Sequence, residues 1–259
     1  MNGPTFSLLG PVRAWHRGTE LPLGSPQQRT TLAVLLLRAG RVTGLEDLVD
    51  ALWPEDPPGT AVGTVRTYLS RLRRTLGDAA GIVSQPGGYQ LDMPPAGTLD
   101  VRLFREHTAA AAEANRRGDH ATAAARLTAA LDLRRGTPLA GTTGRYLAGQ
   151  RARLAELCRA AAADLAAVTI ELGRPDEAVA RLRALVAEQP FAETYHRLLM
   201  TALCRAGRPA DALAHYEQVR RHLADQLGVT PAVELQGLHR RILRGDPAAG
   251  QVAELCGAR

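Results

Sequence analysis

TVRTYLSRLRRTLG, residues 64–77, contains four arginines and no acidic residue. At about 100° per residue in an α-helix, the apolar side chains form a single stripe made up of Val65, Leu69, Leu72 and Leu76. The opposite side, here called the arginine face, carries guanidinium and hydroxyl groups beside a glycine: Gly63, Thr64, Arg66, Thr67, Ser70, Arg71 and Arg74, with Arg73 at the border. Surface helices usually mix charge signs, because opposite charges four residues apart stabilise them. Two interpretations are therefore open, a solvated helix face and a surface that binds nucleic acid.

The segments around this helix favour the second interpretation. Residues 5–23 alternate apolar and polar side chains around glycine and proline, which indicates short antiparallel strands. SPQQRTTLAVLLLRAG, residues 25–40, predicts a helix that Ser25 caps with Gln28 in a capping box. A second short helix is predicted before Pro54.

GIVSQPGGYQLDM, residues 81–93, predicts a β-hairpin directly after the arginine-rich helix. The order of strands, helix, helix, basic helix and hairpin is that of a winged helix-turn-helix. A helix-turn-helix places the second helix of its pair, here the basic helix, in the major groove of DNA, whose width accommodates one α-helix. We therefore expect the arginine face to contact double-stranded DNA.

The composition limits the other classes of function. All 32 basic residues are arginine, so the chain has no lysine for a Walker A loop or a Schiff base. Three scattered cysteines and seven histidines without a pair four residues apart predict neither a disulfide framework nor a metal site. We find no nucleophile–base motif and expect no catalytic residue and no cofactor, although a catalytic triad can be scattered along a sequence. The net charge is +6, but residues 1–95 hold nine arginines and eight acids, so the position of the cations matters more than their number.

No apolar run reaches the ~18 residues that a membrane span needs, and the N-terminus lacks the pattern of a signal peptide. We therefore expect a cytoplasmic protein without a membrane partner.

Residues 94–100, PPAGTLD, resemble a linker, after which the sequence becomes helical and rich in alanine. GRPDEAVARL begins at Gly173 and GRPADALAHY at Gly207, an offset of one tetratricopeptide period.

The predicted fold is mainly α with a small β component, a winged helix-turn-helix followed by a TPR-like α-solenoid. The expected division is a DNA-binding domain, a linker, a helical domain and a mobile tail, at residues 1–94, 95–99, 100–245 and 246–259 respectively.

Residues 4–244 contain long motifs in a familiar order, from LGPVRAW through LPLGSPQQRTTLAVLLLRAG and TVRTYLSRLRRTLG to GGYQL and ALVAEQPFAETYHRLLMTALCRAGRPADALAHY. They resemble the Streptomyces antibiotic regulatory proteins, which join an OmpR-type winged helix to a bacterial transcriptional activation domain. The resemblance implies a nucleoid-associated activator of a biosynthetic cluster for a secondary metabolite such as an antibiotic. It also implies side-by-side self-association on tandem direct repeats near the −35 element, and recruitment of RNA polymerase with its sigma factor.

Within this framework we assign Arg66, Thr67, Ser70 and Arg74 to base edges and flanking phosphates, and Arg71 and Arg73 to phosphates. Thr64 and Gly63, near the start of the helix, either offer backbone N–H groups to a phosphate or simply cap the helix. Arg29 contacts a phosphate or forms a surface ion pair. Gln85 stands at the tip of the hairpin, where family members often carry a basic residue. Contact of the hairpin with the minor groove is therefore weaker or less selective for A·T pairs, or Ser84 and backbone N–H groups supply it.

Glu55 and Asp56, in the loop WPEDPPG, either contact polymerase or form a solvated turn. Trp53, at the start of this loop, is predicted to fill the core. Two other functions remain as alternatives, a repressor with the same DNA-binding domain and a TPR-type scaffold that binds peptides.

Overall fold

The computed structural model describes residues 3–250, and the chain forms two compact units. Within the described residues, the N-terminal unit consists of residues 3–106 and 130–158, and the helical unit of residues 107–129 and 159–250. This division differs from the expected one, whose boundaries at residues 94 and 100 remain predictions. The part of the expected mobile tail at residues 251–259 lies outside the described residues, while Ala249, in the short helix η2 (Pro247–Gly250), is buried.

The N-terminal unit contains two small sheets. The first has the strand order β3-β2-β1-β7, with β1 and β7 parallel. Its strands are β1 (Thr5–Ser7), β2 (Arg13–His16), β3 (Thr19–Glu20) and β7 (Thr98–Leu99). The second has the order β4-β6-β5, and its strands are β4 (Val42–Thr43), β5 (Gly81–Gln85) and β6 (Gly88–Asp92). The predicted hairpin after the arginine-rich helix is therefore confirmed as β5–β6, here called the wing.

Gly88 is required where β6 approaches β4. A Cβ atom at this position would lie 2.1 Å from the carbonyl oxygen of Thr43, and the residue has a positive φ of 158°. Both facts exclude a larger residue from this turn of the wing.

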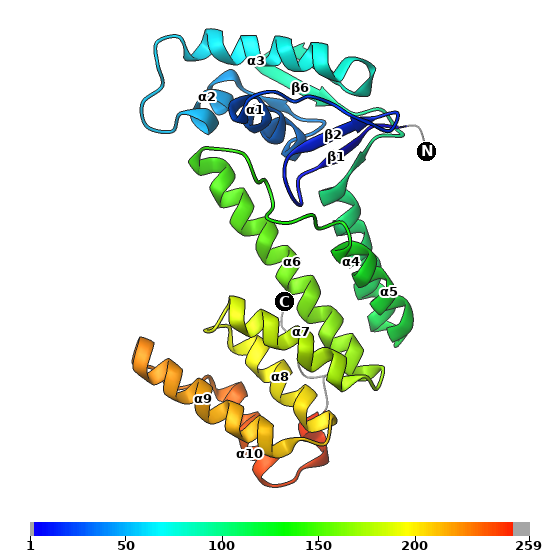
Figure 1. Cartoon of the computed structure of the whole chain (residues 1–259), viewed down its shortest axis with the longest axis vertical. Coiled ribbons are helices and arrows are strands. Elements are labelled where there is room, and N and C mark those ends of the chain that lie inside the picture. Colours follow the sequence, from blue (N-terminus) through cyan, green and yellow to red (C-terminus); the bar gives the residue numbers. More distant parts are fainter. Residues whose placement is uncertain (1–2, 251–259) are drawn as a thin grey trace. The chain divides into compact units, whose positions relative to one another are not determined.

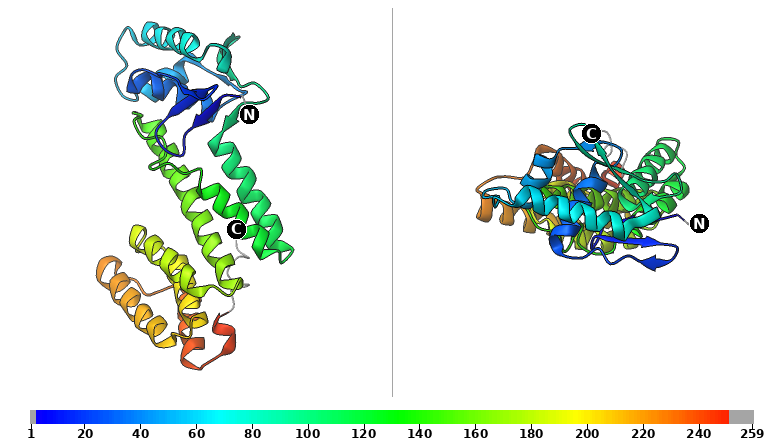
Figure 2. Two further views of the ribbon diagram at one scale, coloured as in Figure 1. Left: turned by 45° about the vertical axis from the view of Figure 1, so that its right-hand side comes forward. Right: turned by 90° about the horizontal axis from the view of Figure 1, so that it is seen from above.

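Three helices complete the winged helix-turn-helix, with α3 lying along the outer side of α1 and the wing (Figures 1 and 2). They are α1 (Pro26–Leu37), α2 (Leu45–Leu52) and α3 (Ala61–Leu76). The predicted capping box of α1 is confirmed, with the Ser25 hydroxyl accepting from the Gln28 N–H at 3.3 Å and the Gln28 side chain accepting from the Ser25 N–H. The predicted apolar stripe of α3 is also confirmed, since Val65, Leu69 and Leu72 are fully buried.

Residues beyond the expected linker also pack into the N-terminal unit. The buried carboxylate of Asp100, at the start of α4 (Asp100–Arg116), accepts hydrogen bonds from the N–H groups of Leu8 and Leu9, both at 2.8 Å. The N–H of Leu139 donates to the carbonyl of Leu8 at 2.9 Å. Leu139 is itself fully buried although its φ is +55°, a backbone conformation that leucine rarely adopts. Parts of the sequence far from residue 94 therefore complete this unit.

The remaining helices run from α5 to α10. They are α5 (His120–Leu131), α6 (Arg145–Glu171), α7 (Pro175–Glu188), α8 (Glu193–Arg205), α9 (Pro209–Leu227) and α10 (Val233–Leu243). The predicted repeat is confirmed, because Gly173 and Gly207 have positive φ values of 75° and 72° just before α7 and α9. Ala178 and Ala212 are fully buried at the corresponding positions of these two helices.

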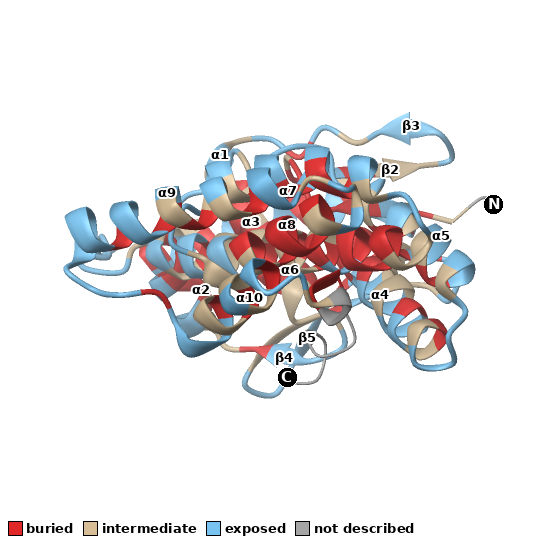
Figure 3. Ribbon diagram, turned by 90° about the horizontal axis from the view of Figure 1, so that it is seen from below, coloured by how far each residue is buried: buried red, intermediate tan, exposed pale blue. Residues whose placement is uncertain are grey.

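The middle helix of this repeat, α8, carries much of the core of the helical unit and is largely buried (Figure 3). The predicted fold class, a winged helix-turn-helix followed by TPR-like helices, is thus confirmed. No helix within residues 3–250 is both long and apolar enough to cross a bilayer.

Candidate nucleic-acid interface

The arginine face of α3 is open to solvent. Arg66, Thr67, Ser70, Arg71 and Arg74 are exposed, whereas Thr64 is partly covered. Within residues 3–250, the guanidinium groups of Arg66, Arg71 and Arg74 have no hydrogen-bond or ion-pair partner. With 3.6 residues per turn, Thr67, Ser70 and Arg74 lie opposite the buried stripe, and Arg66 lies toward the wing. The structure therefore brings these five predicted residues together on one surface without an acid among them.

The two threonine hydroxyls of this face donate to carbonyls of the preceding turn. Thr64 Oγ1 donates to the Thr60 oxygen at 3.0 Å, and Thr67 Oγ1 donates to the Gly63 oxygen at 2.9 Å. The N–H of Thr64 also donates to the Thr60 oxygen, at 2.9 Å. The N–H of Thr64 is therefore already used inside the helix, which leaves its hydroxyl oxygen as an acceptor for any outside group.

Arg73 fastens α3 to the wing. Its Nε–H donates to the carbonyl of Ile82 at 2.7 Å, and its Nη2–H donates to the Ser84 hydroxyl at 3.0 Å. Its guanidinium carbon also lies 5.5 Å from the centre of the Tyr89 ring. The sequence placed Arg73 at the border of the arginine face but did not reveal this bracing role, which uses two of its five N–H donors. Its contact with phosphate stays a prediction.

The wing presents no cation. Gln85 is exposed at the end of β5 and pairs with Gly88 across the two-residue turn. Residues 81–92 contain no basic side chain, and their one acid is Asp92. Contact of Gln85 with the minor groove therefore stays a prediction, and any such contact depends on hydrogen bonds rather than on charge.

Arg29 lies apart from the arginines of α3. Tyr68 of α3 donates to the Gln27 side chain of α1 at 2.7 Å, so Gln27 marks the side of α1 that faces α3. Arg29 follows two residues later, about 200° around the helix. Its Nη1 lies 3.5 Å from the point where a Cβ of Gly141 would be. Its contact with phosphate remains a prediction, on a different side of α1 from the arginine face.

The loop between α2 and α3 exposes Glu55 and Asp56. Trp53, which we expected in the core, is only half-buried. It is the C-cap residue of α2 and its N–H donates to the Val49 oxygen at 2.8 Å, so it sits at the edge of the packed region. Contact of the two acids with polymerase stays a prediction.

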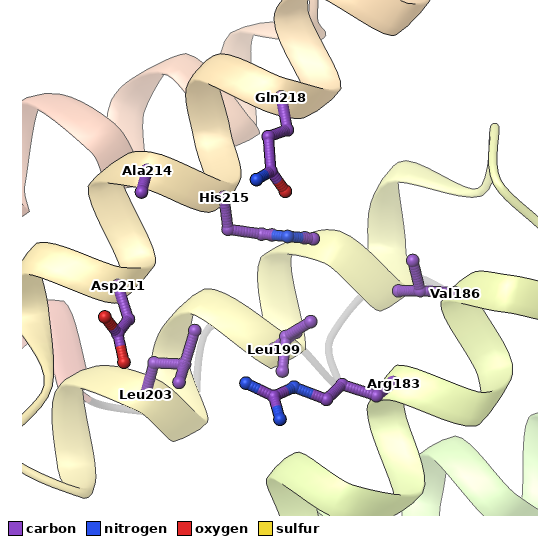
Figure 4. Close-up of a pocket in the computed structure, with 8 residues that line it drawn as sticks. All are labelled: Arg183, Val186, Leu199, Leu203, Asp211, Ala214, His215 and Gln218. Carbon is purple, nitrogen blue, oxygen red and sulfur yellow. The ribbon is translucent and has the colours of Figure 1, made fainter.

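The helical unit has a hollow of its own, of about 370 Å³, among α7, α8 and α9 (Figure 4). Its wall combines apolar side chains such as Leu199 and Leu203 with the polar groups of Arg183, His215 and Gln218. Sequence reasoning did not find this hollow, since helical periodicity shows which residues are buried but not where packed helices leave space.

His215, in the wall of this hollow, and His196 are held neutral. The carbonyl of Pro190 can only accept, so the Nε2 of His196, 2.9 Å away, carries a proton and donates to it. The Nδ1 of His196 then accepts from the Nε2–H of His215 at 3.0 Å. Burial lowers the pKa of both rings, and with the added effects of His196 and the Arg183 charge the pKa of His215 falls to about 4. The pair therefore joins α8 to α9 in its uncharged form.

Two protein families match the chain. Residues 18–91 match the family described as transcriptional regulatory protein, C terminal, and residues 99–243 match the bacterial transcriptional activator domain. Together the two matches cover the winged helix and the helical repeats.

Curated relatives match nearly all of the chain. It is 46% identical over 248 residues to the regulatory protein AfsR of Streptomyces coelicolor, a match that covers 96% of this chain and 25% of AfsR. It is 34% identical to the regulatory protein DnrI of Streptomyces peucetius, with 93% of each chain covered. The chain thus spans about a quarter of the length of AfsR but nearly the whole of DnrI.

A solved structure of Mycobacterium tuberculosis EmbR, in complex with a low affinity phosphopeptide, has a similar fold. It superposes with a TM-score of 0.90 at 34% identity and covers 98% of this chain and 69% of that one. With an OmpR-type winged helix, an activator domain and relatives such as AfsR and DnrI, the chain belongs to the Streptomyces antibiotic regulatory protein family of transcriptional regulators.

Proposed function

We propose that this protein is a sequence-specific DNA-binding activator that inserts α3 into the major groove. The observation that carries the proposal is the set of exposed guanidinium groups at Arg66, Arg71 and Arg74, which have no partner within residues 3–250 and lie on a helix without acids. Guanidinium groups match the paired acceptors of guanine and the oxygens of phosphate. A helix with a buried apolar stripe and a cationic outer face is suited to enter a groove lined by phosphates.

The residues of the face have different roles in this arrangement. Arg66, Thr67, Ser70 and Arg74 contact base edges and flanking phosphates, with about 1–3 kcal/mol of discrimination for each arginine that pairs with a guanine through two hydrogen bonds. Arg71 lies toward the α1 side and contacts phosphate. Arg73 holds the wing against α3, so that β5 and β6 keep a fixed position beside the groove.

We further propose how the protein acts at a promoter. Protomers bind tandem direct repeats near the −35 element, side by side and through a head-to-tail contact, because a direct repeat does not match two-fold symmetry. The DNA-bound protomers recruit RNA polymerase with its sigma factor, and the regulated genes form a biosynthetic cluster for a secondary metabolite such as an antibiotic. The family of the chain supports this proposal, which places its action in the cytoplasm.

Binding of the full-length chain to duplex DNA tests the proposal. Footprinting on the DNA around its own gene should reveal a protected direct repeat. Addition of RNA polymerase should lengthen the protected region. Arg66→Ala and Arg74→Ala should each weaken binding to the protected duplex. Each lost phosphate contact should lower the slope of log K against log salt by about one.

Arg181→Ala is the matched control, because it removes an equal charge from an exposed position on α7. If both α3 variants bound as tightly as the wild type, the assignment of α3 would fail. A protected site at which the protein lowers transcription would indicate a repressor, and absence of salt-dependent duplex binding would favour the peptide-binding scaffold.

Glu55 and Asp56 are proposed to contact a basic surface of sigma factor or polymerase. Reversing both charges should leave duplex affinity unchanged and reduce transcription in the same reconstituted assay. Equal transcription by the doubly reversed variant would remove this contact from the proposal.

A further inference from the structure

Gly63 occupies a position where the protein itself does not need glycine. It is the third residue of α3 and is exposed. Its φ is not in the left-handed region, and a Cβ added there would meet no atom within 4 Å. Glycine weakens a helix relative to alanine because it loses more backbone freedom on folding. Within the described residues 3–250, therefore, no contact explains why this position lacks a side chain.

The surroundings of Gly63 show what an outside contact would meet. At 100° per residue, Gly63 shares the centre of the arginine face with Thr67, Ser70 and Arg74. The Thr67 hydroxyl donates to the Gly63 oxygen at 2.9 Å, so that this side chain lies back against the helix. The centre of the face therefore carries little side-chain bulk in its amino-terminal half, while the long side chains of Arg66 and Arg71 lie on its two sides.

We propose that Gly63 is a close-approach residue, whose missing side chain lets the first turns of α3 lie against the base edges of DNA. This inference rests on the proposed function. The flanking arginines reach phosphates and guanines from their own positions, whereas at Gly63 the helix backbone itself comes to the bases. A methyl group at this point separates the helix from the base pairs and weakens sequence-specific contacts more than it weakens the attraction between arginines and phosphates.

The test compares Gly63→Ala with Gly149→Ala in the full-length chain. Gly149 is a fitting control because it is also an exposed glycine within a helix, here α6, and its Cβ would likewise meet nothing within 4 Å. Both variants should fold, and both should raise the melting temperature by about 2 °C. The probe is a duplex that the wild-type protein enriches from a random-sequence pool, measured beside an unrelated duplex of equal length.

We expect Gly63→Ala to lose on the order of tenfold in affinity for the enriched duplex. Binding to the unrelated duplex, which depends on phosphate contacts, should change by less than about twofold. Gly149→Ala should bind both duplexes as the wild type does.

Three results would overturn the inference. Gly63→Ala could bind the enriched duplex with wild-type affinity, or Gly149→Ala could weaken binding equally. Equal losses of Gly63→Ala on both duplexes would place the close approach at phosphate rather than at the bases. A wild-type chain that enriches no duplex at all would instead overturn the proposed function together with this inference.

Discussion

Arg73 and Arg74 are neighbours of identical chemistry that the structure uses differently. Arg73 donates to the Ile82 carbonyl and the Ser84 hydroxyl, whereas Arg74, on the arginine face, has no partner within residues 3–250. The difference follows from 100° of rotation around the helix axis, which turns one side chain toward the wing and the other to solvent. One of the two therefore stabilises the fold, and the other is free for a ligand.

This difference predicts opposite results for two alanine variants. Arg73→Ala should lower the free energy of unfolding by about 1 kcal/mol, since it removes hydrogen bonds from a charged donor to the wing. Arg74→Ala should stay within about 0.5 kcal/mol of the wild type while it weakens binding to duplex DNA. Urea denaturation of both variants measures the effect, and equal midpoints would show that Arg73 does not brace the wing.

The sequence predicted the burial of single residues well where helical periodicity applies. Val65, Leu69, Leu72 and Leu76 all lie in the core of the N-terminal unit as expected. The bracing by Arg73 could not be predicted, because it depends on how the wing folds back toward α3. The expectation that Trp53 fills the core was wrong for a related reason. An aromatic residue at the end of a short helix is buried only as far as the adjoining loop covers it.

At the scale of elements, the contact between α8 and α9 depends on uncharged side chains. His215 on α9 donates its Nε2–H to the Nδ1 of His196 on α8, a hydrogen bond that requires the accepting ring of His196 to be neutral. The charged and titratable groups that act on the pair are Arg183 of α7, Glu193 of α8 and His222 of α9. Glu193 raises the pKa of His196, but burial outweighs it.

The histidine pair predicts a loss of stability in mild acid. The pKa of His215 is about 4 in the folded protein, and in the unfolded chain it returns to about 6.5. The unfolded state therefore binds more protons between these two values. The stabilisation that the neutral ring provides is complete above pH 6.5 and declines as the pH falls toward 4.

Melting temperatures at pH 7.5, 6 and 5 measure this decline. His215→Gln keeps a donor for His196 without titrating, so its melting temperature should fall less steeply between pH 7.5 and pH 5 than that of the wild type. His107→Gln, on α4, serves as the control and should follow the wild type. Parallel curves for all three proteins would contradict the prediction.

Elements with local signals were predictable, and contacts between distant elements were not. The capping box of α1, the wing and the 34-residue repeat all follow from patterns within a short window, and the structure confirms them. The hydrogen bonds from Leu8 and Leu9 to Asp100 join residues more than 90 positions apart. No periodicity specifies such a partner, so PPAGTLD was interpreted as a plain linker although it leads into β7 and into this buried carboxylate.

At the scale of the whole molecule, the chain passes between its two units three times, near residues 106, 129 and 158. The N-terminal unit therefore needs residues that lie within the sequence of the activator domain. β7 pairs with β1, Asp100 accepts from two N–H groups of the N-terminal segment, and Leu139 is buried in the same unit. A cut after residue 95 removes all three.

We accordingly expect a fragment of residues 1–95 to be much less stable than a fragment of residues 1–158. The shorter fragment uncovers Phe6, Leu8 and Leu9, which are at most 1% exposed in the intact chain. Its urea midpoint should be lower by about 1 M or more, because apolar burial is lost. Circular dichroism during urea denaturation measures both fragments, and matching midpoints would show that residues 96–158 add nothing to the fold.

The three crossings of the chain between its units also set an order of events during synthesis. Residues 1–95 leave the ribosome with the helix-turn-helix and wing complete in sequence, yet the segment that covers Leu8 emerges only later, with Leu139. At the usual pace of translation this delay lasts several seconds. The nascent chain therefore carries an unfinished, apolar surface for that time, a natural place for a chaperone to bind before the protein is complete.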